Sequence, residues 1–296
     1  MNDSSITRFL RSLATPRRLV KFSLLAGLLT FGLASAAADV SAEFVDGQLV
    51  GPQVFAGEGY RTVALVNNGT EDMKFTIARL NDGVAVGDYI AANDALNAAI
   101  ESGDQEAAVK TYLESAVALS GSVVKPHAEY DMVVDLEQGN YVIASHATNS
   151  DSPTSNYLPF EVTDSGSTAA APEASHTLQL ADFSFDFPAT MAASDGLWEV
   201  TNVGDQPHIA AFFKLNEGKT QADLEAFFND STNTGEPPFD TTTTVDIEAL
   251  SPGQTVYMPL DLTAGPQQPD HGALHGRHDP GVHRQLTSAY HAHASA

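Results

Sequence analysis

The segment Asn202-Val203-Gly204-Asp205-Gln206-Pro207-His208 decides how this chain is organised, because its first three residues recur as Asn67-Asn68-Gly69, 135 positions earlier. At the same spacing, residues 79–83 (RLNDG) match residues 214–218 (KLNEG). Self-similarity at a fixed spacing is typical of a duplicated structural unit. The sequence therefore predicts two copies of one domain.

The second half of each copy matches at a shorter spacing, 126, which joins Pro126 to Pro252. The difference predicts an insertion of nine residues in the first copy. Between the copies, residues 164–175 (DSGSTAAAPEAS) are small, polar and contain proline, which predicts a linker. The predicted domains span residues 37–163 and 176–265.

Apolar residues alternate with polar ones inside each copy, which predicts strands that bury one face. A capping box at Thr220 and Asp223 predicts a short helix in the second copy, and residues 104–116 predict one in the first. The alternating positions are Phe183, Phe185 and Phe187; Tyr130, Met132, Val134 and Leu136; and Val256, Met258, Leu260 and Leu262.

Residues 136–141 (LEQGNY) have the spacing of a tyrosine corner, in which a tyrosine hydroxyl bonds back to the chain as it crosses between two sheets. This motif favours a Greek-key sandwich over an open sheet. The predicted fold class is all-β, with a short helical insertion in each of two tandem β-sandwiches.

The form N-x-G-x-x-P-H of residues 202–208 resembles a segment of the cupredoxins, such as plastocyanin, whose histidine is a copper ligand. The resemblance covers residues 44–162 and 177–265, and is nearest to the helix-inserted tandem cupredoxin-like proteins of bacterial envelopes. It implies two tandem Greek-key cupredoxin-like sandwiches.

The ligands of a type 1 copper centre are not retained at the positions that the resemblance implies. In the first copy Met73 stands at the histidine position and Ser145 at the cysteine position, and the chain contains no cysteine. Type 1 copper requires a thiolate beside two histidines. His208 keeps the histidine position of the second copy, and His146 follows the former cysteine position. For both we expect structural roles: packing at the sandwich end for His208, and hydrogen bonding at a sheet edge for His146.

Residues 1–36 have the composition of a signal peptide. A leader with five basic residues precedes the apolar run 22–33, and Ala34-Ser35-Ala36 is typical of a cleavage site. Twelve helical residues reach only about 18 Å, against a hydrocarbon core of about 30 Å, which disfavours the competing reading as a membrane anchor. We therefore expect a periplasmic or secreted protein with no stable membrane span after cleavage.

The chain is strongly acidic, with 38 Asp and Glu against 14 Lys and Arg. This charge excludes nucleic acid as a partner, because it repels phosphate backbones. A saline or extracytoplasmic setting explains it most simply. Without cysteine, each domain must be held by its core alone.

After Gly265 the pattern of the first copy requires two more strands, yet residues 266–296 contain six histidines and few large apolar residues. One hypothesis is a metal-binding tail, in which either His275 and His278 or His271 and His275 share a Zn²⁺, Ni²⁺ or Cu²⁺ ion from one helical face. The other is a shifted reading frame that leaves the second domain incomplete. We favour the second, because the composition changes in the middle of an obligatory structural unit.

No catalytic motif is present: the sequence has no G-x-S-x-G, no H-E-x-x-H, no glycine-rich phosphate loop and no cysteine nucleophile. We expect a non-enzymatic binding or structural protein that needs no cofactor, whose partner is an unidentified protein or small ligand. The alternative is a metal-handling protein, for copper binding or electron transfer, with His208, His271, His275 and His278 as ligands.

Overall fold

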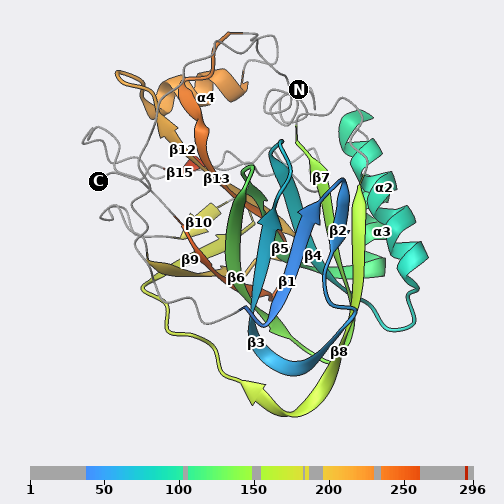
Figure 1. Cartoon of the computed structure of the whole chain (residues 1–296). Helices are drawn as coiled ribbons and strands as arrows, with labels where there is room; N and C mark the ends of the chain where they lie inside the picture. Colours follow the sequence, from blue (N-terminus) through green and yellow to red (C-terminus); the bar gives the residue numbers. More distant parts are fainter. Residues whose placement is uncertain are drawn as a thin grey trace.

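The computed structural model (Figure 1) describes residues 38–102, 106–148, 155–182, 184–186, 196–229, 235–260 and 291–292. The predicted signal peptide and almost all of the histidine-rich segment, with His271, His275 and His278, lie outside these ranges. No helix in the described ranges is long and apolar enough to cross a membrane.

Residues 38–169, here called unit one, form two groups of strands whose inner faces share one core and which are joined where β3 pairs in parallel with β8. The strand pairings give the order β2-β1-β3-β6 on one side and β5-β4-β7-β8 on the other. The elements are β1 Val40–Val45, β2 Gln48–Val50, β3 Val54–Asn67, β4 Met73–Leu80, α2 Val86–Ser102, α3 Glu106–Ser115, β5 Ala116–Val124, β6 Ala128–Leu136, β7 Gly139–Ala147 and β8 Asn156–Ala169.

Residues 176–260, here called unit two, repeat this pairing. Strand β9 lies parallel to β11 as β1 lies parallel to β3, and β14 is antiparallel to β11 as β6 is to β3. Strands β4 and β12 each have eight residues and start 135 positions apart. The elements are β9 His176–Ala181, β10 Ser184–Asp186, β11 Leu197–Asn202, β12 His208–Leu215, α4 Gln221–Asn229, β13 Phe239–Leu250 and β14 Thr255–Pro259, and β15 His291–Ala292 pairs with β12.

A buried asparagine closes the same turn in each unit. The Asn67 side-chain amide donates to the carbonyls of Glu71 and Val124, both at 2.8 Å, and its oxygen accepts the Gly69 N–H at 2.9 Å. Asn202 makes the matching three bonds in unit two, to Gln206, Leu250 and Gly204. Both asparagines have 0% exposure. The repeated N-x-G motif therefore ties each strand end to the neighbouring sheet, as the sequence repeat suggests.

The two units meet along what we call the seam, where β5 and β6 of unit one contact β13 and β14 of unit two. Each of these antiparallel pairings joins strands at matching places in the repeat. The Ser120 hydroxyl donates to the Glu248 carbonyl and the Ser122 hydroxyl to the Asp246 carbonyl, both at 3.4 Å. At the 126-residue spacing, exchange of the units maps the residue pair Ser120–Glu248 onto the pair Ser122–Asp246, although the serine of unit one is the donor in both bonds. The seam thus has an approximate internal two-fold symmetry, like an isologous dimer interface.

The predicted all-β fold is confirmed, with Greek-key sheets and short helices. The alternation in β6 is also confirmed, because Met132, Val134 and Leu136 are buried while Asp135 is exposed. The capping box is present too: the Asp223 carboxylate accepts the Thr220 N–H at 2.8 Å, at the start of α4. Phe183, Phe187 and Leu262 lie outside the described ranges.

Two features of unit one differ from the prediction. The helix predicted at residues 104–116 is confirmed by α3, but a second helix that was not predicted, α2, precedes it, and both cover the outer face of the β4-β5-β7 sheet. Residues 164–169, expected to be linker, instead extend β8, because the long strand β3 offers them a pairing edge. Gly59 permits this approach, since a Cβ atom there would lie 2.3 Å from the Ala169 carbonyl oxygen.

The tyrosine corner is confirmed. The Tyr141 hydroxyl donates to the Glu137 carbonyl and accepts the Glu137 N–H, both at 2.8 Å, and Tyr141 is fully buried. We expect Tyr141→Phe to lower the free energy of unfolding by about 1–3 kcal/mol, because both backbone groups lose their partner. Urea unfolding of the variant measures this loss. An unchanged midpoint would show that the hydroxyl contributes nothing to the crossing.

Candidate functional site

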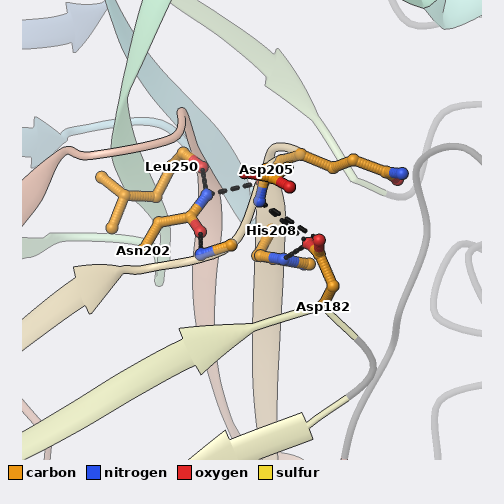
Figure 2. Close-up of polar contacts among 7 residues, drawn as sticks. Asp182, Asn202, Asp205, His208 and Leu250 are labelled. Carbon is orange, nitrogen blue, oxygen red and sulfur yellow. Dashed lines mark hydrogen bonds and ion pairs between the residues drawn. The ribbon is translucent and has the colours of Figure 1, made fainter.

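The end of unit two carries the one predicted ligand that the structure describes, His208. Its side chain is 7% exposed and begins β12 (Figure 2). The Nε2 atom lies 2.9 Å from Oδ1 of Asp182, which follows β9. The Asp205 backbone N–H also donates to both oxygens of this carboxylate, at 3.2 Å each. Asp182 therefore contacts both the His208 imidazole and the turn that precedes His208.

The turn around this pair leaves little space beside it. Asn202 donates to the Gln206 and Leu250 carbonyls, both at 2.7 Å, so its side chain ties the turn to the end of β13 (Figure 2). A Cβ atom on Gly204 would lie 2.4 Å from Oδ1 of Asp182 and 2.6 Å from Nε2 of His208. Glycine is thus required there, because any side chain would displace the His208–Asp182 pair.

In unit one the equivalent positions belong to the hydrophobic core. Met73 is 2% exposed and packs in the cluster that contains Phe75 and Ile77. Ser145 is fully buried, and its hydroxyl has no hydrogen-bond partner within the described ranges. These two side chains fill the place where the resemblance puts a histidine and a cysteine.

His146 lies next to Ser145 on β7, opposite Lys74 of β4. Burial, and then the positive charge of Lys74, lower the pKa of His146 to about 4, so the ring is neutral at pH 7. The expected position at a sheet edge is wrong: β7 pairs with β4 on one side and β8 on the other. An internal strand was not evident from the sequence, because the residues after His146 are polar.

The residues present do not fit a type 1 copper ion. Such a centre needs a thiolate and two histidines, whereas unit two supplies a His–Asp pair, unit one has Met73 and Ser145 at the corresponding positions, and the chain has no cysteine. In the described ranges no three His, Asp or Glu side chains are grouped closely enough to hold a metal. His271, His275 and His278 lie outside those ranges, so the metal-binding hypothesis for them stays a prediction.

Sequence reasoning missed a charged cluster in the seam. Lys74 Nζ lies 2.8 Å from Oε2 of Glu248, with the side chains 25% and 11% exposed, and Asp246 stands two residues before Glu248 on β13. A signal existed: Lys74 lies between the core residues Met73 and Phe75. An ion pair between strands of different units could not be deduced from it.

Comparison with known proteins finds weak structural similarity only. No family model and no curated protein matches the chain. Among solved structures, it is similar to Lac15 from a marine microbial metagenome, at 11% identity and a TM-score of 0.21, over 83% of this chain and 73% of that one. A multicopper oxidase matches at 10% identity and a TM-score of 0.21, over 76% of this chain and 78% of that one. The Cu-containing nitrite reductase of Thermus scotoductus SA-01 matches at 8% identity and a TM-score of 0.18, over 76% of this chain and 55% of that one.

Proposed function

We propose that this chain is an exported, non-enzymatic binding or structural protein built from two tandem cupredoxin-like domains that lack a type 1 copper site. The observation that carries the proposal is the occupation of the ligand positions. Met73 and Ser145 are part of a packed core, and His208 is bonded to Asp182. Side chains used in this way stabilise the sandwich end instead of presenting donors to an ion.

The export part of the proposal rests on the sequence of residues 1–36, with its basic leader, apolar run and Ala-Ser-Ala site. The mature chain would then act in the periplasm or outside the cell, which suits its acidic composition. Its partner is an unidentified protein or small ligand. N-terminal sequencing of the exported protein tests this part: a mature start near Ala37 supports it, and a retained Met1 contradicts it.

Calorimetric titration of the mature chain with Cu²⁺ tests the loss of the copper site. At a protein concentration of about 10 μM, which detects micromolar Kd values, we expect no tight stoichiometric binding that depends on the sandwich ends. Any weak uptake should be the same in His208→Ala and in the unaltered chain. One tightly bound equivalent that His208→Ala abolishes would contradict the proposal.

The second candidate function is metal handling, and the observation that favours it is the pairing of His208 with a carboxylate that remains 31% exposed. In metal sites, a carboxylate that accepts a hydrogen bond from a ligating histidine orients the ring toward the ion. The histidines of residues 266–296 would complete the ligand set. A triple variant, His271→Ala with His275→Ala and His278→Ala, separates the two candidates: loss of a tight copper equivalent supports metal handling, and unchanged weak uptake contradicts it.

A further inference from the structure

At the seam between the units, two carboxylates, Asp246 and Glu248, lie near one lysine, Lys74. Glu248 is 9% exposed and pairs with Lys74. Asp246 lies on the same face of β13, since alternate residues of a strand point the same way. Lys125, the other lysine whose charge acts on Asp246, is already paired with Asp72 at 2.7 Å. Among the described residues, Asp246 therefore forms no ion pair of its own.

Groups from every neighbouring element face this carboxylate. Glu248 comes from its own strand, Lys74 from β4, Lys125 from the end of β5 and Tyr130 from β6. His146 of β7 stands beyond Lys74. Of the two lysines among these groups, Glu248 holds Lys74 at 2.8 Å and Asp72 holds Lys125 at 2.7 Å. A second ionised carboxylate beside this pair is unfavourable, because burial weakens its solvation and Glu248 repels it.

We propose that the seam is a pH-responsive joint, in which one proton on Asp246 keeps β13 docked on unit one and loss of that proton loosens the contact. The backbone around Asp246 carries the contact itself. Ser122 and Ser120 donate to the Asp246 and Glu248 carbonyls, and Ser251 exchanges two bonds of 2.9 Å with Ala118. A charge that draws water to Asp246 weakens these bonds first.

The pKa of Asp246 is shifted in the direction that this joint requires, and the pKa of His146 is shifted in the opposite direction. Burial, and then Glu248, raise the pKa of Asp246 to about 7 from 3.8. The folded protein thus holds a proton that the unfolded chain has lost, and the stability linked to it disappears as the pH rises from about 4 to about 7. His146, lowered to about 4 from 6.5, acts in the opposite direction, and its contribution is lost as the pH falls through the same range.

In the unaltered protein, the effects of Asp246 and His146 on the pH dependence of stability therefore cancel. Between about pH 4 and 6.5 the folded state has a protonated Asp246 and a neutral His146, while the unfolded chain has the reverse. The total number of bound protons is equal, so this pair gives no net slope of stability with pH. The stability of Asp246→Asn should then show the pH dependence due to His146, and that of His146→Gln the pH dependence due to Asp246.

Hydrogen exchange of the Ala118 and Ser251 amides in the full mature chain tests the joint. After correction for intrinsic chemistry, we expect exchange at these amides to be at least about tenfold faster at pH 8 than at pH 5. In Asp246→Asn the ratio should stay within about twofold, because the amide remains neutral. The matched control is Asp135→Asn on β6, an exposed carboxylate, which should behave like the unaltered chain.

Unfolding in urea across the same pH range provides a second, independent readout. Relative to the unaltered chain, the midpoint of Asp246→Asn should rise as the pH goes from 4 to 7, and that of His146→Gln should fall. If Asp246→Asn does not fold, Glu248→Gln replaces it: Asp246 then gains Lys74, and the exchange response moves to lower pH. Equal pH slopes in all variants, or exchange at the seam that is independent of pH, would overturn the proposal.

Discussion

Replacing Asn202 by alanine should lower the free energy of unfolding by about 3–4 kcal/mol, because three hydrogen bonds of a fully buried side chain are lost together. The Leu250 carbonyl loses its amide donor in the interior, and the Gly204 N–H loses its acceptor. The turn that holds His208 against Asp182 is then no longer fixed. Urea unfolding of the full mature chain measures the effect.

Two companion variants show whether the effect belongs to the hydrogen bonds. Asn67→Ala should cause a similar loss, since Asn67 makes the equivalent three bonds in unit one. Asn140→Ala, at an exposed position on β7, should change the free energy of unfolding by no more than about 0.5 kcal/mol. A small effect of Asn202→Ala beside a large effect of Asn67→Ala would show that the second turn is not structurally required.

Replacing Lys74 by methionine should destabilise the protein by about 2–4 kcal/mol, somewhat below the loss for a completely buried pair. The variant leaves the Glu248 carboxylate at 11% exposure beside Asp246 with no cation at 2.8 Å. Thermal or urea unfolding of the full chain measures this loss. It should be larger at pH 8 than at pH 5, because Asp246 is protonated at pH 5 and then no longer repels the Glu248 carboxylate.

The double variant Lys74→Met with Glu248→Leu should recover most of that loss, because it removes both charges and fills the space with apolar atoms. The control is Lys110→Ala, which breaks an exposed pair with Glu114 at 3.8 Å and should cost less than about 0.5 kcal/mol. If the double variant were as unstable as Lys74→Met, the contact between the units would depend on Lys74 for a reason other than charge.

The strands and turns were predictable where the chemistry is local. The tyrosine corner needs only the spacing of residues 136–141, and the capping box needs only Thr220 and Asp223. The repeat could be found because both asparagine turns require the same residues, Asn and Gly two positions apart.

Features that depend on contacts between distant strands were not predictable. Helix α2 is rich in alanine, so its buried face, with Tyr89, does not form a clear apolar stripe. The extension of β8 depends on the length of β3. The seam depends on strands 128 and 124 residues apart, as in the bonds of Ser120 and Ser122. Likewise, the Asp182–His208 pair joins β9 to β12, and no local motif marks Asp182 as the partner.

The most direct test of the proposed function compares the unfolding of the mature chain with excess Cu²⁺ and with a chelator. An ion that binds only the folded state at a concentration of 100 times its Kd adds about 2.7 kcal/mol of stability. If Met73, Ser145 and His208 serve packing alone, the unfolding midpoint should be the same in both solutions. A midpoint raised by copper in the unaltered chain, and not in His208→Ala, would contradict the account.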